Sequence, residues 1–249
     1  MQANFRIGQY VLERPLGEGG MAEVWLARNV HLGTPAAIKF LNRAYAGVPE
    51  IEQRFLNEGR RQGLLSHPNI IKVYGFEYVE DHSFLILQYV DGESLADRLD
   101  RAGRLEPAEA LRIGISVLNG LDYAHENNLV HRDIKPSNVL LDNSGFPYLG
   151  DFRIVLATNE KRLTRTGTSI GTSLYMSPEQ IRKPGSVDRR SDIYSFGCVL
   201  YETLTGEPPF NPPSASRAPS GRSPYGLSPT AIGATRPSGK SSPAFIPTN

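Results

Sequence analysis

The hydrophobic pattern of the chain changes its period near residue 90. Before that point, short apolar runs bounded by glycine, proline and asparagine predict strands over 10–12, 23–26, 36–40, 70–74 and 84–90. Beyond it, apolar residues recur at helical spacing, at positions 95, 99, 108, 111, 115, 118 and 121. The pattern predicts an α+β protein of two lobes, a small β-rich lobe over 8–90 joined by a short connector to a helical lobe over 91–210.

Two further segments are predicted to be helical. The segment 50–65 is rich in charges, and Pro68 shortly after it is a helix stop signal. The segment 188–206 is apolar most of the way round a helix, which is typical of a buried helix. From Asn211 onward, proline, serine, glycine and alanine dominate and large apolar residues are few, so 211–249 is predicted to be a disordered tail.

The overall composition argues against two kinds of partner. The chain has 27 Lys and Arg against 26 Asp and Glu, so no bulk charge favours nucleic acid or a membrane surface. No apolar stretch is long enough to span a bilayer, and the N-terminus has no signal-peptide core. Cys198 is the single cysteine, which excludes an intrachain disulfide and fits a reducing compartment. We therefore expect a soluble, cytoplasmic protein.

The most informative stretch for chemistry is the polar segment 131–138. It contains an imidazole, two cations, a carboxylate and an amide, at His131, Arg132, Lys135, Asp133 and Asn138. A carboxylate can accept a hydroxyl proton, an ammonium can neutralise a phosphate oxygen, and an amide oxygen can bind Mg²⁺. Pro136 lies between Asp133 and Asn138, so the segment is predicted to be a shaped loop and not a helix face.

Two features of the N-terminal part fit phosphate binding, but each also has a simpler explanation. Glycines at 17, 19 and 20 form a turn whose amides can approach phosphates, although a plain hairpin turn would look the same. Lys39 lies inside an apolar strand and needs an anionic partner or a water-filled cleft, unless it points outward from an edge strand. Glu58 is its candidate partner, although a solvated helix face also explains this glutamate.

Taken in order, these residues resemble the protein kinase family. The matching pattern comprises Gly17-x-Gly19 to Val24, Lys39, Glu58, His131-Arg132-Asp133 to Asn138, Asp151-Phe152 and Ser177-Pro178-Glu179. From residue 8 to residue 210 the chain is most similar to the bacterial eukaryotic-like Ser/Thr kinases. The resemblance implies a two-lobed kinase-like fold, ATP and Mg²⁺ as cofactors, and protein substrates in signal transduction.

The resemblance also implies a role for each matching residue. Lys39, held by Glu58, would bind the α- and β-phosphates, while Asp133 would accept the substrate proton or orient its hydroxyl. Lys135 would neutralise the transferring phosphoryl group, and Asn138 and Asp151 would hold Mg²⁺. Besides Lys39, the nucleotide would contact the glycine-rich turn, the hinge and the apolar residues around adenine, namely Leu16, Gly17, Glu18, Gly19, Gly20, Met21, Ala22, Val24, Ala37, Gln88, Val90 and Leu140.

In the same comparison, the segment 152–178 would be the activation loop. Thr164 and Thr166 match positions that related bacterial kinases autophosphorylate, and Arg132 would pair with the resulting phosphate. A threonine-rich loop without modification is the alternative. The resemblance leaves open a homodimer in which one chain phosphorylates another.

The chain departs from the family pattern in two places. The family has Asp-Phe-Gly where this chain has Asp151-Phe152-Arg153, and arginine resists backbone conformations that glycine allows. Family members also continue beyond Phe210 with several more helices, so we expect a C-lobe truncated after the long helix at 188–206. The leading hypothesis is an ATP-dependent Ser/Thr protein kinase. The alternatives are a pseudokinase that still binds nucleotide and an inactive kinase fragment.

Overall fold

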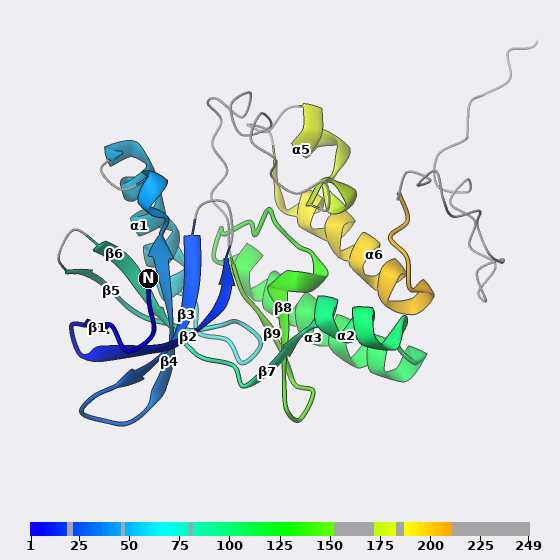
Figure 1. Cartoon of the computed structure of the whole chain (residues 1–249). Coiled ribbons are helices and arrows are strands. Elements are labelled where there is room, and N and C mark those ends of the chain that lie inside the picture. Colours follow the sequence, from blue (N-terminus) through cyan, green and yellow to red (C-terminus); the bar gives the residue numbers. More distant parts are fainter. Residues whose placement is uncertain (19–21, 46–47, 80–81, 152–171, 183–186, 211–249) are drawn as a thin grey trace, which may run out of the picture.

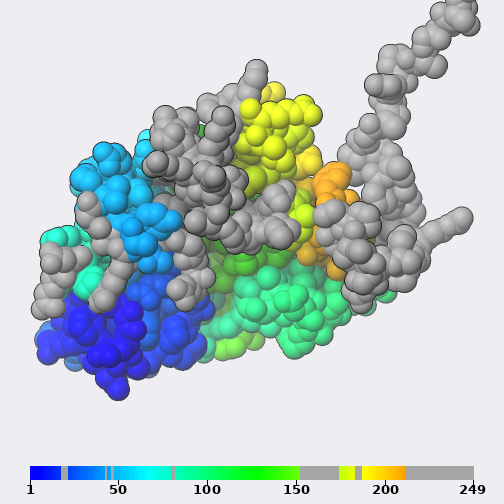
Figure 2. All heavy atoms as spheres, turned by 45° about the horizontal axis from the view of Figure 1, so that its top comes forward, coloured from blue at the N-terminus to red at the C-terminus, as the bar shows by residue number. Residues whose placement is uncertain are grey.

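The computed structural model describes residues 1–18, 22–45, 48–79, 82–151, 172–182 and 187–210, which form two lobes (Figure 1). A six-stranded antiparallel sheet and one long helix make up the N-lobe, and helices dominate the C-lobe. Figure 2 shows the lobes as two adjacent masses, one blue to cyan and the other green to orange. The two-lobed α+β architecture predicted from the change of period is confirmed.

The N-lobe sheet has an apolar cluster on each of its faces. Its strands lie in the spatial order β1 (Arg6–Ile7), β2 (Tyr10–Glu18), β3 (Ala22–Asn29), β4 (Pro35–Leu41), β6 (His82–Leu87) and β5 (Val73–Val79). Successive side chains of a strand point to opposite faces, so β4 places Ile38 and Phe40 in one apolar cluster and Leu41 in another. Helix α1 (Pro49–Gly63) covers the second cluster, to which it contributes Phe55.

The C-lobe is built on the long helices α3 (Pro107–Glu126) and α6 (Arg189–Thr205), with α2 (Leu95–Ala102) and the short α5 (Pro178–Arg182). A three-stranded sheet, β7 (Gly92–Ser94), β8 (Val139–Asp142) and β9 (Pro147–Leu149), lies between these helices and the N-lobe. Ser94 and Asp97 form a capping box that starts α2, and the 3₁₀ turns are η1 (Arg43–Tyr45), η2 (Pro136–Asn138) and η3 (Thr172–Tyr175).

The predicted strands 10–12 and 23–26 are longer in the structure, as β2 and β3, and two other predicted strands have shifted bounds. The predicted strand 70–74 begins only at Val73, because Ile71 bonds to the C-lobe instead and its amide donates to Leu149 O at 2.9 Å. The predicted strand 84–90 ends at Leu87, so 88–90 lies outside the sheet. β-branched and aromatic residues favour an extended backbone in both stretches, but the neighbouring strand decides which residues join the ladder.

Helix α3 is present as predicted, but of the residues that carried its period only Leu121 is buried. Leu111, Ile115 and Leu118 are exposed, whereas the opposite face, with Ile113 and Val117, packs into the core of the lobe. Both faces of this helix are apolar, so the spacing alone could not show which of them is covered.

Helix α6 is likewise present, and most of its surface is covered. Phe196 and Val199 lie in the core, and within the helix only Arg189, Arg190, Ile193 and Gly197 are exposed. Asp192 is a buried charge in this apolar segment.

The core of the N-lobe extends slightly beyond the predicted start of the lobe. Ile7 of β1 is buried in the N-lobe core, just before the predicted start at residue 8. The bounds 8–90 and 91–210 stay predictions, and the predicted tail 211–249 lies outside the described residues. Among the helices of the described part, none is both long enough and apolar enough to cross a membrane.

Candidate active site

Lys39 stands on an interior strand, since β4 lies between β3 and β6. In the register of the sheet, Val24 and Leu85 lie directly opposite Lys39, and Gly17 lies opposite Val24. Opposed residues of antiparallel strands share a face, so these residues form one row on the face that α1 covers. The alternative of an outward-pointing lysine on an edge strand is therefore wrong.

The ammonium group of Lys39 lies between two carboxylates. Its Nζ is 3.3 Å from Glu58 Oε1 on α1 and 2.7 Å from Asp151 Oδ1. Burial opposes the charged form of Lys39, but Asp151 and Glu58 together outweigh it and raise the pKa of the ammonium above its ordinary 10.5. In turn the Lys39 charge, as the largest influence, lowers the pKa of Asp151. Lys39 is therefore an ammonium and Asp151 a carboxylate at neutral pH, and Glu58 is the partner of Lys39 that the sequence predicted.

The loop 131–138 brings together three of the predicted residues. Lys135 Nζ lies 3.1 Å from Asp133 Oδ2. Asn138 Nδ2 donates to the backbone oxygen of Asp133 at 2.7 Å and to its Oδ2 at 3.1 Å. Pro136 opens the turn η2, which brings Asn138 back toward Asp133. Because Asp133 engages the amide nitrogen of Asn138, the amide oxygen is the atom suited to a cation.

Gly150 joins this loop to Asp151. Gly150 N donates to Asn138 O at 3.0 Å, and His131 Nε2 donates to Gly150 O at 2.7 Å. A Cβ at Gly150 would lie 2.8 Å from Ile71 Cδ1, so a side chain there would have to displace the end of the Ile71 side chain. Asp151 has a φ of 57°, a left-handed conformation that costs a non-glycine residue about 1–3 kcal/mol. The second carboxylate is thus held to the loop through the backbone.

Asp192 of α6 holds the same loop from the helical side, and sequence reasoning missed it. Its side chain is 1% exposed, and Oδ1 accepts from Arg132 N at 2.7 Å. Oδ2 accepts from His131 N and from His125 Nε2, each at 2.8 Å. Arg132 has a φ of 66°, so this contact holds a strained backbone directly before Asp133. The one signal in the sequence was a carboxylate inside an apolar helical segment.

His131 is buried as a neutral ring in this network. Burial, the largest influence, lowers its pKa below the ordinary 6.5, although the carboxylates of Asp192 and Asp133 oppose the shift. Its Nε2–H donates to Gly150 O, and its Nδ1 accepts from Asp133 N at 3.3 Å. Both ring nitrogens are therefore engaged in the form that carries a single proton.

We expect the free energy of unfolding to fall as the pH is lowered through and below 6.5. The unfolded chain takes up a proton at His131 near its ordinary pKa, whereas the folded chain does so only at lower pH, so acid favours the unfolded state. Urea unfolding across this range measures the slope, which His131→Gln should reduce. His67, whose pKa burial also lowers, stays in the variant and leaves a residual slope. Equal slopes in parent and variant would contradict the assignment.

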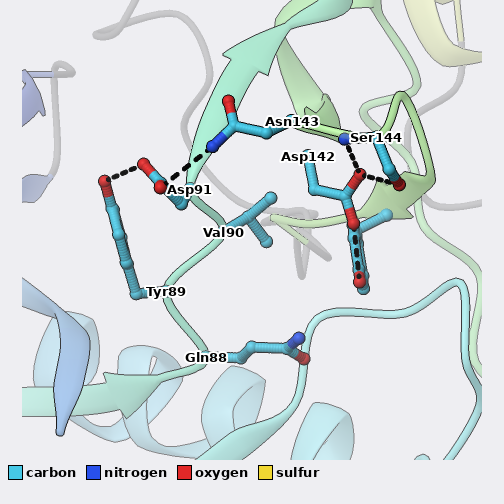
Figure 3. A pocket seen from close by; sticks show the side chains of 8 residues that line it. Gln88, Tyr89, Val90, Asp91, Asp142, Asn143 and Ser144 are labelled. Carbon is cyan, nitrogen blue, oxygen red and sulfur yellow. Dashed lines mark hydrogen bonds between the residues drawn. The ribbon is translucent and has the colours of Figure 1, made fainter.

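The segment 88–91 links the lobes and is bonded to both. Gln88 N donates to Lys72 O at 2.8 Å on the N-lobe side. Asp91 accepts from the Tyr89 hydroxyl at 3.2 Å and from Asn143 Nδ2 at 3.0 Å, which ties the linker to the β8–β9 turn (Figure 3). The predicted hinge is thus the covalent connection between the lobes.

A cavity of about 280 Å³ lies beside this linker (Figure 3). It is lined by the linker and by residues of the β8–β9 turn, namely Gln88, Tyr89, Val90, Asp91, Asp142, Asn143, Ser144 and Tyr148. Gln88 and Val90 of the predicted nucleotide contacts line it, whereas Lys39, Asp133 and Asp151 do not.

The remaining predicted nucleotide contacts are partly described. Val24 and Ala37 lie on the same face of the sheet as Lys39, and Leu140 lies on β8 of the C-lobe. Leu16 and Gly17 lie near the end of β2, and Ala22 begins β3. The tip of the glycine-rich turn, Gly19, Gly20 and Met21, lies outside the described residues, and the side chain of Glu18 is not described. The two predicted phosphorylation sites, Thr164 and Thr166, also lie outside the described residues. The same holds for Arg153, where the chain departs from the family pattern.

Comparison with known proteins agrees with this arrangement. A family model described as the protein kinase domain matches residues 10–221. The chain belongs to the protein kinase family. The kinase match continues past residue 210, where the sequence predicted the end of the helical lobe.

Bacterial serine/threonine-protein kinases are among the relatives of this kinase domain. It is 40% identical to serine/threonine-protein kinase PrkC of Bacillus subtilis over 208 residues, which cover 84% of this chain and 32% of PrkC. It is 43% identical to a probable serine/threonine-protein kinase of Streptomyces coelicolor, over 82% of this chain and 31% of that protein. The chain thus spans about a third of the length of these curated relatives. The predicted resemblance to bacterial eukaryotic-like kinases is confirmed.

A solved structure supports the fold of the kinase domain. The kinase domain of PknI from Mycobacterium tuberculosis matches with a TM-score of 0.68 and 29% identity, over 85% of this chain and 79% of that chain. Protein kinases use ATP and Mg²⁺, and Mg²⁺ is commonly bound by one or two protein oxygens together with substrate phosphates. The Asp151 carboxylate and the Asn138 amide are oxygen donors of that kind, and Lys39 offers a cation for phosphates. The residues present therefore fit these cofactors.

Proposed function

We propose that this kinase domain transfers the γ-phosphoryl group of ATP to serine or threonine hydroxyls of proteins, in signal transduction and with Mg²⁺. The observation that carries the proposal is the placement of Lys39 between Glu58 and Asp151, together with Asp133 beside Lys135. Phosphoryl transfer depends on positioning and electrostatic stabilisation more than on covalent chemistry by the protein. The positively and negatively charged side chains of this site, held by backbone contacts, supply the positioning and the electrostatic stabilisation.

On the nucleotide side, Lys39 would bind the α- and β-phosphates, and Glu58 would keep its ammonium in place. Asp151, which contacts Lys39 at 2.7 Å, would hold Mg²⁺ together with Asn138. The cation would offset the negative charge of the phosphates. The nucleotide base and the phosphates would also contact the residues predicted from the family, namely Leu16, Gly17, Glu18, Gly19, Gly20, Met21, Ala22, Val24, Ala37, Gln88, Val90 and Leu140.

On the substrate side, Asp133 would orient the hydroxyl and accept its proton. The hydroxyl oxygen forms a bond to the γ-phosphorus as the bond from this phosphorus to the β-phosphate oxygen breaks. Lys135, 3.1 Å from Asp133, would stabilise the charge on the transferring group.

Several finer features belong to the same proposal. Thr164 and Thr166 would be autophosphorylated, in a homodimer, and Arg132 would receive the phosphate. Protein substrates are implied by the family, and we place the domain in the cytoplasm.

A second candidate is a nucleotide-binding pseudokinase. The observation in its favour is Arg153, which follows Asp151-Phe152 where the family has glycine. A side chain there restricts the backbone that sets Asp151, so nucleotide could bind while transfer is slow. Radiolabel transfer from ATP to the chain or to added protein separates the candidates, because binding without transfer favours the pseudokinase.

We expect saturating Mg-ATP to raise the melting temperature of the parent and not that of Lys39→Met. A ligand at a hundredfold excess over its Kd adds about 2.7 kcal/mol to the folded state. For a domain of this size this corresponds to roughly 5–10 °C. Lys72→Met, the same change at an exposed lysine, should keep the full shift. The absence of any shift in folded parent protein would contradict both candidates.

A further inference from the structure

Helix α1 comes into very close contact with the sheet at Gly59. A Cβ built on Gly59 would overlap Leu85 Cδ2 and would lie 3.2 Å from Leu85 Cδ1 and Cγ. Leu85 is 1% exposed and belongs to the apolar cluster that contains Leu41 and Phe55. Its side chain cannot move aside into solvent, because it is enclosed by other side chains. Leu85 thus occupies the space that any side chain at position 59 would need.

This contact is directly beside the ion pair of the proposed active site. Leu85 lies opposite Lys39 in the register of β4 and β6, so both side chains point toward α1. On α1, Gly59 follows Glu58, whose Oε1 is 3.3 Å from Lys39 Nζ. Glu58 and Gly59, which are consecutive on α1, therefore lie over Lys39 and Leu85, which are adjacent in one row of the sheet. The separation of α1 from the sheet at Gly59 consequently sets the distance between Glu58 and Lys39.

We propose that Gly59 is a positioning residue of this kinase, which seats α1 on Leu85 and so keeps Glu58 within ion-pair distance of Lys39. A side chain at position 59 would lift α1 from β6 or push Leu85 into its neighbours. Either change separates Glu58 from Lys39 and leaves Asp151 as the carboxylate that holds the ammonium. The catalytic consequence rests on the proposed function, whereas the seating of the helix does not.

Helix α1 offers a matched control at Gly63. A Cβ there would lie 3.8 Å from Val73 Cβ, an ordinary van der Waals contact. Both glycines belong to α1, and alanine favours a helix at each. Gly63→Ala is therefore expected to keep the parental kcat/KM and to melt no lower than the parent. Gly59→Ala is expected to melt lower and to lose about tenfold or more in kcat/KM for ATP.

The contact can be tested in a second background, Leu85→Ala, which removes the atoms that a Cβ would meet. In this background Gly59→Ala should no longer lower kcat/KM, and it should raise the melting temperature because the new methyl group fills part of the cavity. The same substitution then has opposite signs in the two backgrounds. A general effect on helix α1 would have the same sign in both, and that result would overturn the proposal.

The position of Lys39 also has a readout that needs no catalysis. We would measure acylation of Lys39 by an N-hydroxysuccinimide ester in nucleotide-free protein, by mass spectrometry of the Lys39 peptide. Labelling should be slow in the parent, Gly63→Ala and the double variant, and faster in Gly59→Ala. This pattern in a parent that transfers no phosphate would support the seating of α1 and reject the proposed function. Parental labelling and parental kcat/KM in Gly59→Ala would overturn the proposal.

Discussion

Asp133→Asn is expected to lower phosphotransfer by about 10²–10⁴-fold, the usual contribution of a positioned acid or base. The amide keeps the shape of the side chain and one oxygen, so it can still accept from Asn138. It cannot take up a proton from the substrate hydroxyl, and it removes the negative charge 3.1 Å from Lys135. Initial rates of γ-phosphoryl transfer to the chain itself and to an added protein measure the effect.

The same variant should separate catalysis from nucleotide binding. Asp133 faces the substrate hydroxyl in the proposed mechanism, so the melting shift with Mg-ATP should be unchanged in Asp133→Asn. Asp122→Asn, the same replacement at an exposed position of α3, should keep both the rate and the shift. If Asp133→Asn retained more than a tenth of the parental rate, Asp133 would not be the residue that handles the proton.

Asp192→Ala is expected to lower the free energy of unfolding by about 3–5 kcal/mol, because it leaves three inward-facing donors without their acceptor. These donors are the backbone amides of His131 and Arg132 and the ring of His125. Typical domains have a total stability of only about 5–15 kcal/mol, so this loss is a large part of it. The effect far exceeds what an exposed ion pair contributes, since solvent and salt screen such pairs.

Asp192→Ala should also abolish activity in the protein that remains folded. Arg132 is in the left-handed region with a φ of 66°, and without Asp192 its backbone can relax and move Asp133. Urea unfolding and rate measurements at a temperature where the variant is folded test the two parts. Asp188→Ala is the matched control, because Asp188 caps the start of the same helix and its loss should destabilise the protein less. Equal losses of stability and activity in the two variants would show that Asp192 contributes no more than a helix cap or a packing contact.

The sequence by itself determined the local elements and the chemistry of the central loop. Strand and helix periods are local properties, so β4, α1 and α6 were predicted close to their observed bounds. Asp133, Lys135 and Asn138 lie within a few residues of one another, and Pro136 sets the turn that brings them together. Such short-range geometry can be predicted because few backbone conformations join residues so close in the chain.

Tertiary structure alone decided which surfaces and distant residues meet. Helix α3 has apolar residues on two faces, and its period cannot tell which face packs, so Leu111 and Ile115 are exposed while Ile113 is buried. Asp192 lies far along the chain from the loop it holds, and its role follows only from the backbone amides that α6 brings to it. A pattern along the chain specifies an element, whereas the partner of a buried charge depends on how the elements pack.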